Sequence, residues 1–177
     1  MAGDPGTTKI RVWRHADAAD LARLADDREV WLGLRDLFPH PYGIGDALAF
    51  ISLAGRMDPQ SFFAIEVDGS LAGGIGCTRR TDVERIGAEV GYWLGRAYWG
   101  RGIATAALRL LTAHAFAADP ELRRLWAVPF VTNIASARVL EKAGYTREGT
   151  LRQSAIKDGR VLDQWMYAIL REDVAPR

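Results

Sequence analysis

The run Tyr-Trp-Gly-Arg-Gly-Ile-Ala-Thr at residues 98–105, called the glycine loop below, constrains the fold more than any other segment. It lies between a strand-like stretch, residues 83–94, and a helix-like stretch rich in alanine and leucine, residues 103–117. Two glycines one residue apart let the backbone turn tightly and leave its N–H groups uncovered. Because a helix begins at once, those N–H groups and the positive end of the helix dipole face one point. Such a point binds phosphate.

The other patterns predict helices and strands that do not alternate regularly, which indicates the α/β class with a mixed sheet. Two Asp-Gly pairs, at 68–69 and 158–159, are typical of hairpin turns. Asp17 is placed to cap the first helix, and Gly144 to end the last. Gly87 and Gly91 indicate bulges in the strand before the glycine loop. In chain order we expect strands over residues 10–13, 61–67, 71–77, 83–94, 123–128, 145–155 and 161–170, and helices over 17–28, 46–57, 103–117 and 133–143.

The chain of 177 residues is long enough to bury a core as one domain. We expect that domain over residues 9–171, with a flexible N-terminal segment at 1–8 and a C-terminal tail at 172–177. Hydrophobic residues make up 49% and charged residues 25%, with a net charge of +1. This balance provides no attraction to nucleic acid or to an anionic membrane, so neither is an expected partner.

Metal and disulfide chemistry are not expected. The single cysteine, Cys77, excludes an internal disulfide and a cysteine-based cluster. The three histidines, His15, His40 and His114, lack metal-ligand spacing. The first residues are polar and lack the apolar stretch of a signal peptide, and no run has the length of a transmembrane helix. We therefore expect a cytoplasmic protein.

Two common phosphate-binding loops do not fit the glycine loop. A nucleoside-triphosphatase loop needs Lys and then Ser or Thr after its last glycine, whereas Ile-Ala-Thr follows here. A dinucleotide loop needs a third glycine, and an acidic residue about twenty positions later at the end of a parallel strand. The third glycine is missing, and Glu121 precedes a strand instead. On this motif alone, the interpretation that the glycines only form a tight turn, with no ligand, remains an alternative.

A second motif, Asn-Ile-Ala-Ser-Ala-Arg-Val-Leu-Glu-Lys-Ala-Gly-Tyr at residues 133–145, follows behind a predicted strand. With the Trp-Gly-Arg-Gly-Ile-Ala of the glycine loop, it resembles the GNAT superfamily of acyl-CoA-dependent N-acetyltransferases. The resemblance spans nearly the whole chain. It implies a single-domain GNAT-like α/β fold, with a mixed, mostly antiparallel sheet of about seven strands flanked by about four helices. Gly-Tyr-Trp-Leu at 91–94, with Asn133 and Ser136, is similar to the ribosomal-protein N-terminal acetyltransferase branch.

The resemblance implies that acetyl-CoA donates the acyl group, that coenzyme A is released, and that no metal takes part. Backbone N–H groups from Arg101 to Thr105 would bind the pyrophosphate. Backbone groups of residues 92–94, splayed by a bulge, would pair with the pantetheine arm and offer an oxyanion donor. Asn133 would contact that arm and also cap its helix. The expected cofactor-binding residues are Tyr92, Trp93, Leu94, Trp99, Gly100, Arg101, Gly102, Ile103, Ala104, Thr105, Asn133 and Ser136.

Three residues are candidates for catalysis. Leu140 stands where many superfamily members carry a tyrosine acid, and Ser136 would instead donate a hydrogen bond to the thiolate, one turn after Asn133. A thiol with a pKa near about 8.5 needs little help to leave. Glu89, on the strand before the glycine loop, and Glu66, on the strand before the first hairpin, are alternative bases. Alternation along the strand does not say whether the face that carries Glu89 is the one that forms the cleft.

The acceptor is expected to be a primary amine, with a protein or peptide N-terminus as the leading candidate. An α-amine has a pKa of about 7.7–8.0 against about 10.4 for lysine, so it suits a site without a strong base. A polyamine, an aminoglycoside or an amino acid is the alternative acceptor, and a non-catalytic acyl-CoA-binding module is the alternative class. The resemblance also allows a homodimer. The expected acceptor-pocket residues are Trp31, Phe38, His40 and Tyr42, for which core packing or a turn is an equal explanation.

Overall fold

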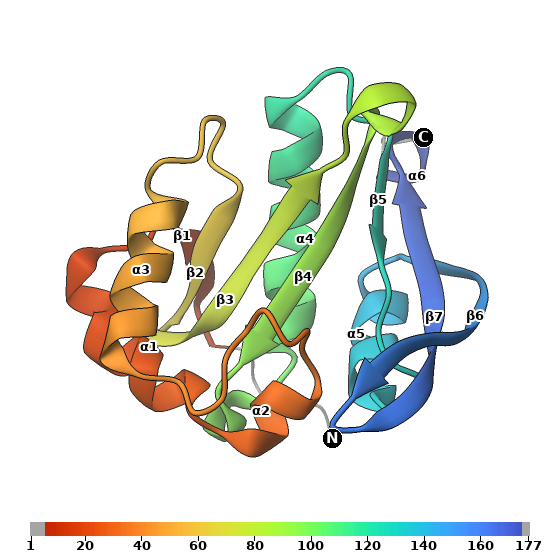
Figure 1. Ribbon diagram of the computed structural model, residues 1–177. Coiled ribbons are helices and arrows are strands. Elements are labelled where there is room, and N and C mark those ends of the chain that lie inside the picture. Colours follow the sequence, from red (N-terminus) through yellow and green to blue (C-terminus); the bar gives the residue numbers. More distant parts are fainter. Residues whose placement is uncertain (1–5, 175–177) are drawn as a thin grey trace.

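A seven-stranded sheet between two layers of helices is formed by residues 6–174, the part of the chain that the computed structural model describes (Figure 1). The strand order across the sheet is β1-β2-β3-β4-β5-β7-β6. Neighbouring strands are antiparallel except β4 and β5, which are parallel. The strands are β1 Thr8–Arg11, β2 Phe62–Val67, β3 Ser70–Arg79, β4 Gly87–Leu94, β5 Arg124–Ala127, β6 Thr146–Lys157 and β7 Arg160–Leu170.

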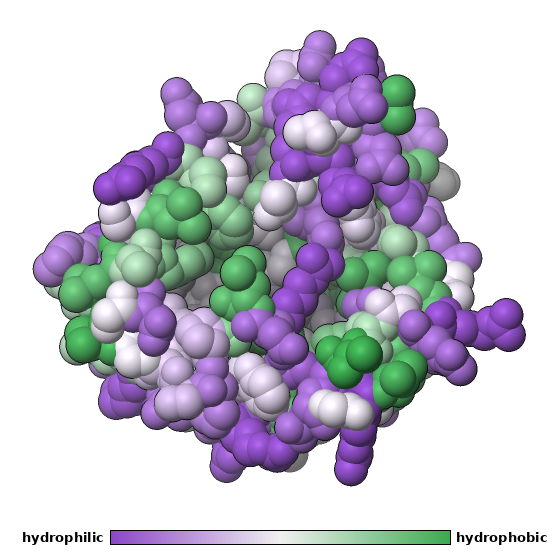
Figure 2. Space-filling model, viewed as in Figure 1, coloured by the Kyte–Doolittle hydropathy of each residue, from purple (hydrophilic) through white to green (hydrophobic). Residues whose placement is uncertain are grey.

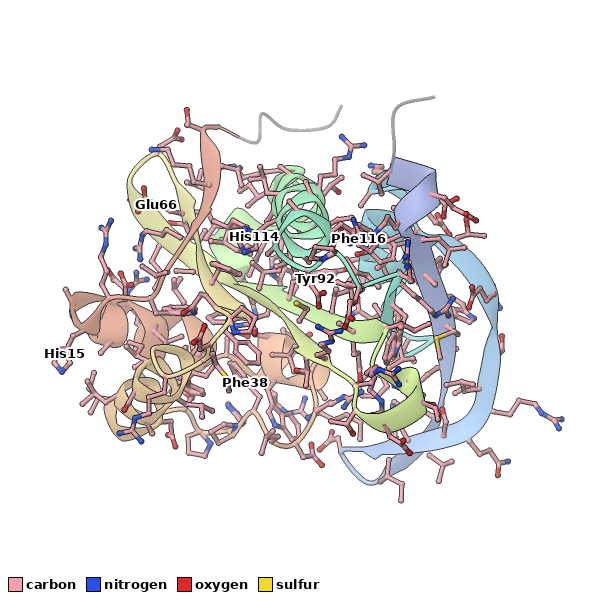
Figure 3. All side chains as sticks on the ribbon, turned by 90° about the horizontal axis from the view of Figure 1, so that it is seen from above. His15, Phe38, Glu66, Tyr92, His114 and Phe116 are labelled. Carbon is pink, nitrogen blue, oxygen red and sulfur yellow. The ribbon has the colours of Figure 1, made fainter. Side chains whose placement is uncertain are left out.

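The helices lie on both faces of this sheet. Figure 3 shows α4 on one face and α1 with α3 on the other. Short 3-10 turns occur at His15–Asp17, Asp82–Glu84 and Arg96–Tyr98. The α-helices of the described residues are α1 Ala18–Ala25, α2 Arg28–Leu32, α3 Ile44–Ala54, α4 Ile103–Ala118, α5 Ile134–Lys142 and α6 Arg171–Val174.

Two buried clusters hold these layers to the sheet. The larger lies between the sheet and α4 with α5, and its fully buried side chains include Ile65, Leu108, Leu111, Leu125 and Leu140. The smaller joins α1 and α3 to the opposite face around β2 and β3, and it includes Trp13, Leu21, Ala47, Ile51 and Leu71. Because successive strand residues face opposite sides, β4 contributes to both layers. Tyr92 packs against the larger cluster and Trp93 against the smaller.

Both Asp-Gly hairpins are confirmed. Asp68 and Gly69 have φ of 48° and 84°, and they join β2 to β3. Asp158 and Gly159 have φ of 50° and 71°, and they join β6 to β7. Two successive positive φ values match the right-handed twist of the flanking strands. Gly144, with φ of 98°, follows α5 as predicted.

The predicted helix at 17–28 is wrong near its C-terminal end. The first helix ends at Ala25, and α2 begins after Asp27, whose side chain accepts a hydrogen bond from the N–H of Glu29 at 2.9 Å. The Asp26 side chain accepts from the N–H of Tyr42 at 2.9 Å, so a contact distant in sequence holds this break. Including α2 and α6, the described residues form six α-helices where about four were expected.

The predicted bulges at Gly87 and Gly91 are also wrong. The register between β3 and β4 runs without a shift from Gly73 opposite Leu94 to Arg79 opposite Ala88. The strand begins at Gly87 rather than at residue 83, because the N–H of Arg80 donates to the Gly87 carbonyl at 3.0 Å and closes a turn over the residues between.

At the chain ends, β1 already includes Thr8, which the flexible segment 1–8 was expected to contain. Residues 1–5 of that segment lie outside the described residues. The expected tail at 172–177 starts within α6, where the Asp173 side chain accepts from the N–H of Leu170 at 2.9 Å. Residues 175–177 lie outside the described part.

Candidate active site

The sheet divides between β4 and β5, and this division is called the fork below. The two parallel strands pair only over Gly87–Glu89 of β4. Beyond Glu89, β4 stays paired with β3 as far as Leu94. The chain after β5 instead stays beside β7, where the N–H of Trp165 donates to the Pro129 carbonyl at 3.0 Å. Proline has no N–H to offer β4. Each strand therefore keeps its outer partner, and the two central strands diverge.

The fork opens into a cavity of about 1010 Å³ that extends under α3 and the loop between α2 and α3. Figure 2 shows hydrophobic side chains gathered over α3 on this face. Polar groups enter where the strands divide, from Glu89, Tyr92 and Ser136. An apolar wall with a few converging polar groups is the usual construction of a ligand pocket. The aromatic side chains of the lining are Phe38, Tyr42, Phe50, Phe62, Tyr92, Trp93 and Phe130.

The glycine loop forms the N-terminus of α4. Gly100 and Gly102 have φ of 73° and 81°, in the left-handed region that favours glycine. The first intrahelical bond joins the N–H of Ala106 to the Gly102 carbonyl, so the N–H groups of residues 103–105 lack an acceptor within the helix. Among the described residues, no side chain caps this end. A Cβ at Gly100 would meet no atom within 4 Å. Uncovered N–H groups beside open space fit a pyrophosphate.

Alternation along β4 decides which backbone groups face the fork. The N–H of Gly95 donates to Ala72 on the β3 side at 2.9 Å. The backbone of Trp93, two residues earlier, therefore also pairs with β3, opposite Gly74 in the register. The N–H groups of Tyr92 and Leu94 point the other way, into the fork. The divergence of β4 from β5, rather than a bulge, exposes them.

Trp99 and Arg101 occupy the strand side of the loop. The indole N–H of Trp99 donates to the Leu94 carbonyl at 2.8 Å, so this side chain ties the loop to the end of β4. The guanidinium of Arg101 lies 5.8 Å from the centroid of the Tyr98 ring. The indole N–H of Trp99 is thus used within the protein, and the backbone of this residue, rather than that N–H, is available to hydrogen-bond a cofactor.

Ser136 and Tyr92 meet at the floor of the fork. The Asn133 side-chain oxygen accepts from the N–H of Ser136 at 3.0 Å, so Asn133 is the N-cap of α5. The Tyr92 hydroxyl lies 2.9 Å from Ser136 Oγ and 3.2 Å from the Ser136 carbonyl oxygen. Burial raises the pKa of the Tyr92 phenol, which stays protonated at neutral pH. Asn133 is not among the described residues that line the cavity.

Glu89 lines the cavity and forms an ion pair with Arg35, from the loop after α2. Its side chain is 21% exposed, whereas that of Arg35 is 66% exposed. The guanidinium is thus free to move into solvent, and the carboxylate is positioned in the wall. A carboxylate at this place can accept a proton from an ammonium group directly or through a water molecule.

Glu66 is placed elsewhere. Its carboxylate accepts from Arg11 Nε at 2.6 Å, and the same guanidinium holds Asp17 at 2.7 and 2.8 Å. The hydrogen bond from Arg11 lowers the pKa of Glu66. Figure 3 shows Glu66 toward the β1–β2 edge and Tyr92 at the centre. Glu66 is not among the described residues that line the cavity, so the structure does not bring it to Ser136.

The four expected acceptor residues divide into two pairs. Phe38 and Tyr42 line the cavity with ring centroids 4.8 Å apart. Burial, with Asp46 nearby, raises the pKa of Tyr42 to about 12, so its hydroxyl stays neutral. Trp31 and His40 are stacked on each other outside the lining of the main cavity.

Trp31 instead covers the buried ammonium of Lys157, which lies 3.5 Å from its ring centroid. Lys157 is 2% exposed and donates to Asp36 at 2.7 Å. Arg28 pairs with Asp158 at 2.6 Å beside this contact. These cationic contacts tie the segment that carries Phe38 and Arg35 to the β6–β7 hairpin.

Several lining residues carried no usable signal. Arg35 is one arginine among many in the sequence, and nothing local links it to Glu89. Gln164 lines the cavity from β7 and donates to the Val128 carbonyl at 2.7 Å, a contact set by the sheet. Phe50 shares an apolar face of its helix with Ala47 and Ile51, a spacing that core packing explains without a ligand. Burial raises the pKa of Cys77 to about 11, which keeps its thiol protonated and inert.

Within residues 6–174, no three His, Cys, Asp or Glu side chains are grouped so as to hold a metal ion. No helix in this part of the chain is long and apolar enough to span a bilayer.

Comparison with known proteins adds a family and relatives. The family model described as acetyltransferase (GNAT) domain matches residues 8–146. The uncharacterized N-acetyltransferase p20 of Bacillus licheniformis is 32% identical over 125 residues, 71% of this chain and 68% of that protein. The ribosomal-protein-serine acetyltransferase of Escherichia coli (strain K12) is 37% identical over 81 residues, 46% of this chain and 45% of that protein. The matched part thus spans about two thirds of the first of these relatives and less than half of the second.

The solved structure of Mycobacterium smegmatis RimJ in complex with CoA-disulfide is similar over nearly the whole chain. Its TM-score is 0.86 at 27% sequence identity, over 97% of this chain and 86% of that one.

Proposed function

Because this chain belongs to the GNAT family of acyl-CoA-dependent N-acetyltransferases, we propose that it acetylates the N-terminal α-amine of a protein or peptide. The observation that carries the proposal is the fork, which gives one cavity access both to Glu89 and to the Tyr92–Ser136 pair. Relatives support the acceptor class, since one is named a ribosomal-protein-serine acetyltransferase. We place the activity in the cytoplasm, where acetyl-CoA and protein N-termini are both available.

The residues at the fork fit acetyl-CoA. The uncovered N–H groups of residues 103–105 would hold the pyrophosphate at the positive end of α4. The fork-facing N–H groups of Tyr92 and Leu94 would pair with the pantetheine arm, and one of them would donate to the developing oxyanion. When bound, acetyl-CoA supplies the activated acetyl thioester. Ser136 would donate a hydrogen bond to its sulfur.

Glu89 is the base in this proposal. An entering ammonium would replace the exposed guanidinium of Arg35 at the carboxylate, which then accepts the proton directly or through water. A carboxylate is a weak base. An α-ammonium, with a pKa of about 7.7–8.0, loses its proton to such a group far more readily than a lysine ammonium of about 10.4. The chemistry therefore favours an N-terminal amine over a lysine side chain.

The size of the cavity also favours an extended acceptor. Its volume of about 1010 Å³ lies at the upper end of the range of roughly 300–1,000 Å³ for small-molecule pockets. The cavity has room for the first residues of a peptide beside the pantetheine arm. The aromatic wall would take an apolar side chain of that peptide, because Phe38 and Trp93, in edge contact at 5.5 Å, both line the cavity.

The test is release of free thiol from acetyl-CoA with pooled acceptors, followed by mass spectrometry of the products. The pools contain peptides with varied N-terminal residues, lysine peptides with blocked N-termini, polyamines and aminoglycosides. We expect acetylation of free peptide N-termini only, and loss of most of that turnover in Glu89→Gln. Acetylation of a small amine alone would refute the acceptor but keep the chemistry. Tight binding of coenzyme A without turnover in any pool would indicate a non-catalytic module.

A further inference from the structure

The hydroxyl groups of Tyr92 and Ser136 lie within hydrogen-bond distance of each other. Their two protons can be shared among three acceptors, namely the two hydroxyl oxygens and the Ser136 carbonyl oxygen. Tyr92 Oη lies 2.9 Å from Ser136 Oγ and 3.2 Å from the Ser136 carbonyl oxygen. The Tyr92 ring is held by the core cluster under α4 and α5, and Ser136 is held by the Asn133 cap, 3.0 Å from its N–H. Neither side chain needs to move for the hydrogen bond between them to change direction.

Two arrangements of the protons are available to this pair. In the first, Tyr92 donates to the Ser136 carbonyl, and the Ser136 hydroxyl donates to Tyr92. In the second, Tyr92 donates to Ser136 Oγ, and the Ser136 proton points away from Tyr92, toward the cavity that both residues line. Only the second arrangement leaves the serine proton for a ligand. An anion in the cavity stabilises the second arrangement, because it attracts that proton.

We propose that Tyr92 is a positioning residue, which directs the Ser136 hydroxyl toward the sulfur of coenzyme A and thereby stabilises the thiolate. The inference rests on the proposed function, in that coenzyme A occupies the fork. As the thioester bond breaks, its electron pair stays on the sulfur and the amine nitrogen binds the acetyl carbon. Both hydroxyl groups keep their protons, and the amine proton leaves through Glu89 or water.

Tyr92 suits this role because it does not ionise. Burial raises the pKa of its phenol well above that of a free thiol, so it remains a donor over the pH range in which the sulfur titrates. A donor hydrogen bond to Ser136 Oγ also polarises the serine O–H, which strengthens its bond to the anion. A phenylalanine at this position would keep the ring packing and remove both effects.

The experiment measures the pKa of the coenzyme A thiol in its binary complex with the enzyme. The ultraviolet absorbance of the thiolate is followed against pH, with the desulfo-coenzyme A complex as the blank for protein tyrosines and Cys77. No acceptor and no turnover are involved. In the wild-type complex we expect the pKa to lie below that of free coenzyme A, because Ser136 donates to the anion.

Ser136→Ala should raise that pKa by about 1 or more, since a hydrogen bond to a charged group is lost. Tyr92→Phe should raise it by about 0.5, because the serine donor is weakened rather than removed. The double variant should match Ser136→Ala. The control is Tyr145→Phe, which removes another buried tyrosine hydroxyl, 2.9 Å from Thr112 Oγ1, without contact to Ser136. It should leave the thiol pKa unchanged.

An unchanged pKa in Tyr92→Phe, an equal rise in Tyr145→Phe, or additive rises in the double variant would each overturn the inference. A wild-type pKa equal to that of free coenzyme A would do the same. Failure to bind coenzyme A would remove the cofactor site and with it the proposed function. The expected titrations in a protein that acetylates no peptide N-terminus would keep this inference and refute only the acceptor.

Discussion

Arg11→Met would remove the cation that holds two carboxylates at the end of β1. The guanidinium donates to Asp17 at 2.7 and 2.8 Å, to Glu66 at 2.6 Å and to the Val12 carbonyl at 3.1 Å. The side chains of Arg11, Asp17 and Glu66 are only 15%, 10% and 13% exposed. Methionine keeps most of the packing of the arginine stem, so the variant chiefly tests the charge.

The magnitude follows from Asp17, which would lose two charge-assisted bonds and keep one, from the N–H of Arg14 at 2.8 Å. Removing one partner of a buried ion pair costs about 3–5 kcal/mol, and the retained bond places this case at the lower end, near 3 kcal/mol. For a chain of this size, 1 kcal/mol lowers Tm by about 2–4 °C. We therefore expect Tm to fall by about 6–12 °C at neutral pH.

The pH dependence gives the sharper measurement. Burial alone would raise the pKa of Asp17, but hydrogen bonds from Arg11 and from the Arg14 N–H outweigh it and lower that pKa; the bond from Arg11 also lowers the pKa of Glu66. A lowered pKa stabilises the fold above the ordinary carboxyl pKa near 4 and ceases to do so as the pH falls below it. The gap in unfolding free energy between wild type and Arg11→Met should therefore shrink as the pH falls below about 4.

Urea unfolding over this pH range measures the gap, with Arg23→Met as control. Arg23 pairs with Asp20 at the surface, where the side chains are 66% and 58% exposed, so its loss should cost no more than about 0.5 kcal/mol. A gap below 1 kcal/mol at neutral pH, or one that does not change with pH, would refute the reasoning.

Glu66→Gln should lower stability and leave turnover near the wild-type value, and a large loss of turnover would make Glu66 a candidate base again.

Three further variants probe the site and the sheet. Gly102→Asp should reduce affinity for coenzyme A by at least about 100-fold in calorimetry, because a carboxylate would face the pyrophosphate; Gly159→Asp, at φ of 71°, has a similar backbone cost and should bind normally. Glu89→Gln should slow acetylation most at low pH, where the amine most needs a base, and a wild-type pH–rate profile would exclude Glu89. Gly73→Ala should destabilise the fold by about 2–3 kcal/mol in denaturant unfolding, because its Cβ would lie 2.1 Å from the Trp93 carbonyl oxygen. The control Gly91→Ala, whose Cβ would meet no atom within 4 Å, should destabilise it far less.

Local structure was predictable at most points where a signal acts over a few residues. The Asp17 cap is an exception, because its carboxylate accepts from Arg11 and from the N–H of Arg14 and makes no capping bond to α1. Asp68 and Asp158 begin their hairpin turns because Asp-Gly readily adopts two successive positive φ values. Asn133 caps α5 through a side chain that reaches only three residues ahead. Gly102 begins α4 because glycine readily adopts the positive φ, here 81°, that this turn requires. The break between α1 and α2 was missed because Tyr42, sixteen residues away, holds Asp26 there.

The splaying of β4 shows the limit of local reasoning. Glycine at residues 87 and 91 indicates a bulge on sequence alone, yet β4 is regular against β3. Its fork-facing groups are exposed because the chain after β5 keeps β7 as its partner, with Phe130 opposite Gln164. Which neighbour a strand keeps depends on the whole sheet, and no window of the sequence contains that information.

The sequence by itself determined the glycine loop, the family, and the order of the seven strands with the four longest helices, because these depend on residue type and short spacing. It also determined that Glu89 and Tyr92 face opposite sides of one strand. Only the tertiary structure decided that one cavity reaches both of these faces through the fork. Contacts 44 and 54 residues apart, from Tyr92 to Ser136 and from Glu89 to Arg35, fix the side chains that line it. The same packing placed Glu66 in an ion pair at the sheet edge, because Arg11 on β1 lies opposite Ala64, two residues from Glu66 on the neighbouring strand.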